Sequence, residues 1–134
     1  MANGTIAFDT LTTSDSVNTG TEKSIDTSYL FNGIPKAWAN FNESDSTIRD
    51  DFNVTSLTDN GTGYFTVTLT NSMSSDDYVR TGSAGENANT GGNRVLGLRL
   101  PATGSFNLFT CNTGGSASDT PDTCVAALGD LAWQ

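Results

Sequence analysis

The sequence contains no histidine, and its only lysines are Lys23 and Lys36. The missing histidine excludes Ser-His-Asp triads, Cys-His dyads and most transition-metal sites. A serine–lysine pair remains open in principle, but neither lysine lies in a recognisable motif. The glycine-rich run 82–92 lacks the Gly-Lys-Ser/Thr ending of a phosphate-binding loop. We therefore expect no catalytic residues, no cofactor and no bound metal.

Basic residues and long apolar runs are also scarce. Fifteen acidic residues stand against six basic ones, for a net charge of −9, which disfavours nucleic acid and anionic lipid as partners. No apolar run approaches the roughly 20 residues needed to span a bilayer. Residues 2–5 have neither a basic start nor an apolar stretch, so we expect no signal peptide and synthesis in a cytoplasm.

A helical pattern is missing too, because no run of ten residues has a clear apolar period of 3.6. Threonine, serine and asparagine are abundant, which favours strands and turns. Seven to nine short strands, broken by Gly, Asn and Pro, predict an all-β antiparallel β-sandwich (jelly-roll-like) or a small barrel. The length predicts a single β-domain over 1–134, with 1–28 as a candidate extended N-terminal arm.

Several segments are predicted from this pattern. Residues 5–8, 78–80, 95–100 and 106–109 read as strands, and 125–133 as a last strand or a short helix. Residues 82–92 read as an exposed loop. An acidic doublet stands at Asp50-Asp51 and another at Asp76-Asp77. Neighbours on a strand point to opposite faces, so neither doublet alone supplies the facing carboxylates of a glycosidase. We also expect an ion pair between Arg49 and Asp50.

The clearest local signal is a hairpin. Phe52 and Val54 alternate with polar residues before a turn, and Phe65, Val67 and Leu69 alternate with threonines after it. Asn-Gly tolerates the positive φ of a tight turn. Calcium binding by the oxygen donors of Asp59, Asn60 and Asp76/Asp77 is a weaker alternative, because no EF-hand spacing is present. The predicted turn residues are Asp59, Asn60, Gly61 and Gly63.

Four segments carry a resemblance to a known group of proteins. They read MANGTIAFDTL (1–11), KSIDTSYLFNG (23–33), AWANFN (37–42) and IRDDFNVTSLTDNGTGYFTV (48–67). As a set they resemble a module of small structural proteins and tail-fibre segments of marine tailed phages. The resemblance runs from Met1 to about Tyr78, and the remainder of the chain has no counterpart in it.

The resemblance implies a non-enzymatic virion protein with no catalytic residues. We expect an oligomeric head-decoration (cement or knob) protein or fibre module on the particle's exterior. By analogy the oligomer is a homotrimer bound to the capsid or to a tail appendage. The alternative is a tail-fibre module that binds a glycan on the host surface. A depolymerase is the least favoured reading.

Aromatic residues supply the candidates for subunit contacts. The alternation of 37–42 places Ala37, Ala39 and Phe41 on one face, predicted as core, and Trp38 on the other. Trp38 could equally lie inside a sandwich core, or mark a second layer or a subunit contact. The interface candidates are Tyr29, Phe31, Trp38 and Phe41.

The two cysteines bracket a polar loop. Cys111 and Cys124 are separated by small and turn-forming residues, which suggests a disulfide at the base of the loop. Closing a loop of about 14 residues would stabilise the fold by roughly 3 kcal/mol. Two free thiols are the alternative. There are no other ligands for a metal and no Cys-x-x-Cys motif.

Overall fold

The computed structural model describes residues 10–12, 24–86 and 94–132. The chain divides into two compact units, Met1–Ile34 and Pro35–Gln134. The sequence predicted one domain with an arm over 1–28, and the division between the units falls a few residues beyond that. The strand predicted at 5–8 lies outside the described residues.

The first unit contains a small antiparallel ribbon and a short helix. Strand β1 (Thr10–Thr12) pairs with β2 (Ser24–Asp26), and α1 (Thr27–Gly33) follows at once. Asp26 caps the helix, because its carboxylate accepts hydrogen bonds from the backbone N–H of Ser28 at 2.8 Å and from its hydroxyl at 2.6 Å. These bonds lower the pKa of Asp26.

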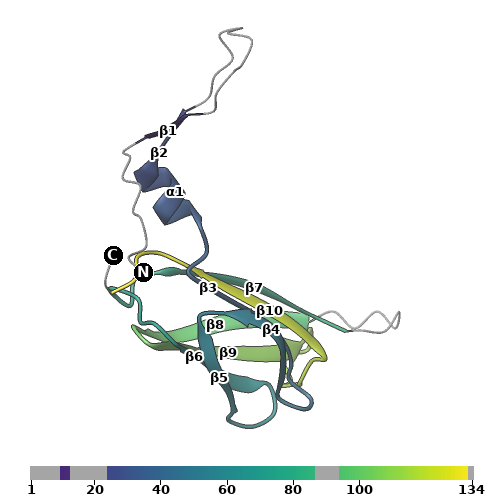
Figure 1. The fold of residues 1–134 in the computed structure, drawn as a ribbon. Coiled ribbons are helices and arrows are strands. Elements are labelled where there is room, and N and C mark those ends of the chain that lie inside the picture. The colour runs from purple at the N-terminus through teal and green to yellow at the C-terminus, as the bar shows by residue number, and fades with distance from the viewer. Residues whose placement is uncertain (1–9, 13–23, 87–93, 133–134) are drawn as a thin grey trace, which may run out of the picture. The chain divides into compact units, whose positions relative to one another are not determined.

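The second unit is a sandwich of two four-stranded antiparallel sheets (Figure 1). The first sheet has the order β4-β3-β10-β7, and the second has the order β5-β6-β9-β8. Among the described residues neither sheet closes on itself, so the predicted β-sandwich is confirmed and the barrel alternative is not. The strands are β3 (Ala37–Asn42), β4 (Thr47–Phe52), β5 (Val54–Asp59), β6 (Tyr64–Leu69), β7 (Val79–Gly85), β8 (Arg94–Ala102), β9 (Ser105–Asn112) and β10 (Asp122–Leu128).

The core lies between the sheets and follows the period-two alternation. On β3, Ala37, Ala39 and Phe41 point inward and are at most 3% exposed, as predicted. Trp38 points to the outer face of the first sheet. The remaining buried apolar side chains come mainly from β6, β9 and β10: Phe65, Val67, Leu69, Met73, Tyr78, Phe106, Leu108, Val125 and Ala127.

Asn53 carries the chain from the first sheet to the second in a single residue. Its φ is +58°, a conformation that asparagine tolerates better than most residues. Its side-chain oxygen accepts from the N–H of Asn71 at 2.7 Å, and its amide donates to the carbonyl of Lys36 at 2.9 Å. Phe52 therefore ends β4 and does not belong to the hairpin of β5 and β6, which corrects the sequence-based prediction.

Three further boundaries can be compared with the sequence. The segment predicted as a loop from Gly82 is strand as far as Gly85, while 87–93 lie outside the described residues. A Cβ on Gly82 would lie 2.5 Å from the carbonyl oxygen of Cys124, so only glycine fits this close strand pairing. Strand β8 continues past Pro101. The last segment is strand, not helix, over Asp122–Leu128.

Candidate functional site

The predicted hairpin turn is confirmed. The N–H of Asn60 donates to the carbonyl of Tyr64 at 2.8 Å, and the N–H of Tyr64 donates to that of Gly61 at 2.7 Å. The carboxylate of Asp59 accepts from the N–H of Gly61 at 2.7 Å. Gly61 and Gly63 have φ values of +113° and +72°, which explains why glycine occupies both positions. The oxygen donors of Asp59 and Asn60 thus serve turn geometry.

Gly63 also fastens this turn to the neighbouring loop. Its carbonyl accepts from the N–H of Thr110 at 2.8 Å, and its N–H donates to the carboxylate of Asp119 at 2.6 Å. A Cβ here would lie 2.3 Å from the carbonyl oxygen of Thr110. The hairpin turn and the loop 113–121 therefore meet at one end of the sandwich.

The role of Glu43, which is only 1% exposed, was not predicted from the sequence. One carboxylate oxygen accepts from the hydroxyls of Thr110 at 2.7 Å and Thr123 at 2.8 Å. The other accepts from the N–H of Thr120 at 3.0 Å, and the N–H of Glu43 donates to the carbonyl of Thr120 at 2.9 Å. Glu43 thus holds both ends of the loop that the two cysteines bracket. A glutamate in a polar turn carries no local signal of burial.

The predicted disulfide between Cys111 and Cys124 is wrong. Cys111 is out of phase with the inward-facing Leu108 on β9 of the second sheet, and Cys124 is out of phase with Val125 on β10 of the first sheet. The two thiols therefore lie on opposite outer faces and are free, and Cys111 is nevertheless buried, where its strand pairs with Ala117 of the loop. The loop is held by Glu43 in place of a covalent bond.

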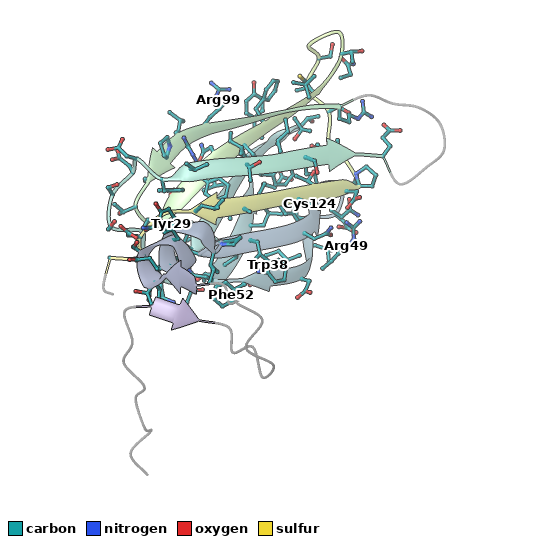
Figure 2. All side chains as sticks on the ribbon, turned by 90° about the horizontal axis from the view of Figure 1, so that it is seen from above. Tyr29, Trp38, Arg49, Phe52, Arg99 and Cys124 are labelled. Atoms are coloured by element: carbon teal, nitrogen blue, oxygen red, sulfur yellow. The ribbon has the colours of Figure 1, made fainter. Side chains whose placement is uncertain are left out.

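An aromatic pair lies on the outer face of the first sheet. Trp38 and Phe52 are directly opposite each other on β3 and β4, and they are 37% and 54% exposed (Figure 2). A shallow depression of about 370 Å³ lies along β7 and β10 of the same sheet, lined in part by Cys124 and Ala126. We call the exposed surface around Trp38, Phe52, Cys124 and Ala126 the aromatic face.

The other three interface candidates have different positions. Phe41 is fully buried, so its assignment to an interface was wrong, because the alternation of β3 turns it into the core. Tyr29 and Phe31 lie on α1 of the first unit, where they are 74% and 54% exposed.

A polar network lies beside the aromatic face. Arg49 forms an ion pair with Asp122 at 3.2 Å, not with Asp50 as predicted, and it also donates to the carbonyl of Pro121. The Asn40 side chain accepts from Arg49 at 3.0 Å and donates to the sulfur of Cys124 at 3.1 Å. Arg49 can reach β10 because it occupies a β-bulge in the pairing of β3 with β4.

Tyr78 closes the sandwich on the side of the second sheet. Its hydroxyl lies 3.1 Å from the carbonyl oxygens of both Ala102 and Ser105, and its ring packs on Phe106 with centroids 6.4 Å apart. Burial raises the pKa of Tyr78, and the nearby charge of Arg80 opposes that shift.

No metal-binding cluster is found in the described part of the chain. Within 10–12, 24–86 and 94–132 no three His, Cys, Asp or Glu side chains come together as metal ligands would. Over the same residues, no helix has the length and apolar character needed to cross a bilayer. No protein-family profile, curated protein sequence or solved structure matches this chain.

Proposed function

We propose that this chain is a non-enzymatic structural component of a tailed-phage virion. In this proposal it stands on the outside of the particle as an oligomeric head-decoration protein or fibre module. The virion assignment is supported by the resemblance to phage structural proteins, which runs from Met1 to about Tyr78. The eight-stranded sandwich is compatible with it, because a packed double sheet makes a rigid building block.

The aromatic face is the observation that carries the proposal. Two large aromatic side chains stand next to each other on an outward sheet face, where polar residues are usual. Aromatic residues are enriched at the centres of protein interfaces, and charged residues at their rims. Here Arg49 and Asp122 lie to one side of the pair. We assign this face to contact with another copy of the chain, and the expected assembly is a trimer.

Light scattering coupled to size-exclusion chromatography tests this assignment. We expect the unchanged protein to elute with the mass of three chains. Trp38→Ser and Phe52→Ser should each weaken association about 30-fold, the effect of losing an interface hot spot of about 2 kcal/mol. Val95→Ser is the matched control, because Val95 is 51% exposed but lies on the second sheet. A monomer at all concentrations, or equal effects of all three variants, would contradict the assignment.

Its place in a virion is tested separately, by quantitative mass spectrometry of purified particles. Hundreds of copies per particle indicate a head-decoration protein, and a few to a few tens indicate a tail appendage. Particles that lack the protein would rule out both.

A host-binding module that recognises a glycan is the second candidate function. A pocket on the outer face of the second sheet favours it, because the pocket combines an aromatic ring, a guanidinium and a carboxamide.

A further inference from the structure

The pocket lies among three neighbouring strands of the second sheet. It has a volume of about 160 Å³ and is lined by Tyr64 of β6, Arg99 and Leu100 of β8, and Asn107 and Leu108 of β9. Arg99 is directly opposite Asn107 in the pairing of β8 with β9. The site therefore depends on the sheet register, and β-strands hold side chains more firmly than loops do.

Tyr64 supplies an aromatic wall in a fixed orientation. Its ring packs on Phe109 with centroids 4.6 Å apart and an interplanar angle of 34°. It nevertheless remains 42% exposed, so part of the ring is open to a ligand. Aromatic rings carry a negative face, which attracts the slightly positive C–H groups on one side of a sugar ring.

Arg99 supplies a cation that has no ion-pair partner within the described part of the chain. The ion pairs of the described residues join Arg49 to Asp122 and Arg94 to Glu86, and Arg99 takes part in neither. Arg99 is exposed and adjoins the pocket. A guanidinium binds carboxylates through two parallel hydrogen bonds. On a chain with a net charge of −9, this is a local site for an anion.

Asn107 is oriented by a relay of hydrogen bonds that starts at the hairpin turn. The Asn60 side chain donates to the hydroxyl of Thr66 at 2.9 Å, and that hydroxyl donates to the side-chain oxygen of Asn107 at 3.1 Å. The oxygen of Asn107 is thereby engaged within the protein. Its NH₂ group is left as a donor beside the pocket, which suits a sugar hydroxyl.

Leu100 shows backbone strain at the rim of the same pocket. Its φ is +42°, although it is not a glycine and Pro101 follows it, a combination that ordinarily favours extended backbone. The pairing of β8 with β9 is irregular here, between Arg99 and Ala102. Leu100 is also 68% exposed. Strained residues and bulges concentrate at binding sites, where they aim side chains that a regular strand would not.

From these four observations we propose that the pocket binds one sugar residue that carries a carboxylate, such as a uronic acid. The sugar ring stacks on Tyr64, its carboxylate pairs with Arg99, and one hydroxyl accepts from Asn107. A volume of about 160 Å³ suits one ring, and the open surface leaves room for the rest of a chain. Asn60 and Thr66 are positioning residues. The proposal does not depend on assembly into a virion.

An NMR titration of the full chain with two small glycosides tests this site. The probes are the methyl glycosides of galacturonic acid and galactose, which differ only in the carboxylate. We expect the acid to bind with a dissociation constant on the order of 1 mM, as befits so small a ligand. It should shift the backbone amides of 98–100 and the side-chain NH₂ of Asn107. The neutral sugar should bind at least tenfold more weakly, and added salt should reduce the difference.

Variants separate the three contacts. Arg99→Gln should remove the preference for the acid and leave the weak binding of galactose unchanged, whereas Arg99→Lys should restore part of the preference. Tyr64→Ala should weaken both probes at least tenfold, and Tyr64→Phe should retain them within about threefold because the ring remains. Val79→Ala, on the first sheet, is the surface control. Equal shifts with both probes, an unchanged preference in Arg99→Gln, or no shift at tens of millimolar would overturn the proposal.

Discussion

At the scale of single residues, the buried carboxylate of Glu43 takes the place that a disulfide was expected to fill. It accepts hydrogen bonds from Thr110, Thr120 and Thr123, all of which are buried. These donors are neutral, so the carboxylate is stabilised here by hydrogen bonds, and neither ion pair of the described residues includes it. Such bonds to a charged group contribute more than bonds between neutral groups.

Substitutions of Glu43 should therefore destabilise the fold strongly. We expect Glu43→Ala to lower the free energy of unfolding by about 3 kcal/mol, because three buried donors lose their acceptor. Glu43→Gln should cost about 1–2 kcal/mol, since an amide NH₂ would face the N–H of Thr120, donor against donor. Urea unfolding followed by tryptophan fluorescence measures both.

Asp76→Asn is the matched control for Glu43, because it also removes one carboxylate charge but from an exposed position. It should change the free energy of unfolding by less than about 0.5 kcal/mol. A loss of similar size in Glu43→Ala would mean that the buried network contributes little.

The two cysteines show which part of their placement could be predicted from the sequence. Cys111 and Cys124 both fall out of phase with the apolar residues of their strands, so their outward direction was readable from the alternation. What was not readable is that β9 and β10 belong to different sheets. Phe41 was a different error, since its own alternation already predicted burial.

At the scale of secondary-structure elements, the hairpin of β5 and β6 contains two glycines that are required for different physical reasons. Gly61 and Gly63 both have positive φ, but their surroundings differ. A Cβ on Gly61 would meet no atom within 4 Å, whereas a Cβ on Gly63 would lie 2.3 Å from the backbone of Thr110. The first glycine is needed for its conformation alone, and the second also for a close approach.

Alanine at each position should reveal the difference. Gly61→Ala should cost about 1 kcal/mol, the usual penalty for a strained φ in a non-glycine residue. Gly63→Ala should cost about 3 kcal/mol or more, because the backbone of β9 or the turn itself must move. Thermal unfolding of the two variants under identical conditions gives the comparison. Equal losses would mean that the turn relaxes away from β9 without penalty.

The same elements show which structural features can be predicted from neighbouring residues in the sequence. Asn-Gly and the alternation of Phe65, Val67 and Leu69 predicted the hairpin correctly, because turn and strand preferences are encoded within a few residues. The corner at Asn53 was missed, because its partners Lys36 and Asn71 are distant in sequence. The pocket of the second sheet was missed for the same reason, since three strands contribute to it.

At the scale of the whole molecule, the buried apolar residues are unequally distributed between the two units. Every residue of the buried apolar cluster belongs to Pro35–Gln134. The first unit contributes a short ribbon and a helix of seven residues. Burial of apolar surface is the main source of stability in small domains. The sandwich should therefore fold without the residues that precede it.

We accordingly expect a chain of residues 35–134 to unfold cooperatively. Its free energy of unfolding should lie within about 1 kcal/mol of the full chain, because every residue of the buried apolar cluster is retained. Both must be measured at the same protomer concentration, since association adds to apparent stability. Failure of the shortened chain to fold would show that Met1–Ile34 supplies packing the sandwich requires.

The shortened chain also separates two ways of forming an oligomer. If the aromatic face of Trp38 and Phe52 makes the subunit contact, residues 35–134 should still assemble, and Trp38→Ser should dissociate them as in the full chain. If instead Tyr29 and Phe31 make the contact, the shortened chain should be monomeric while keeping its stability. Because the exposed aromatic residues of the two units are removed independently, native mass spectrometry of these two chains assigns the contact to one unit or the other.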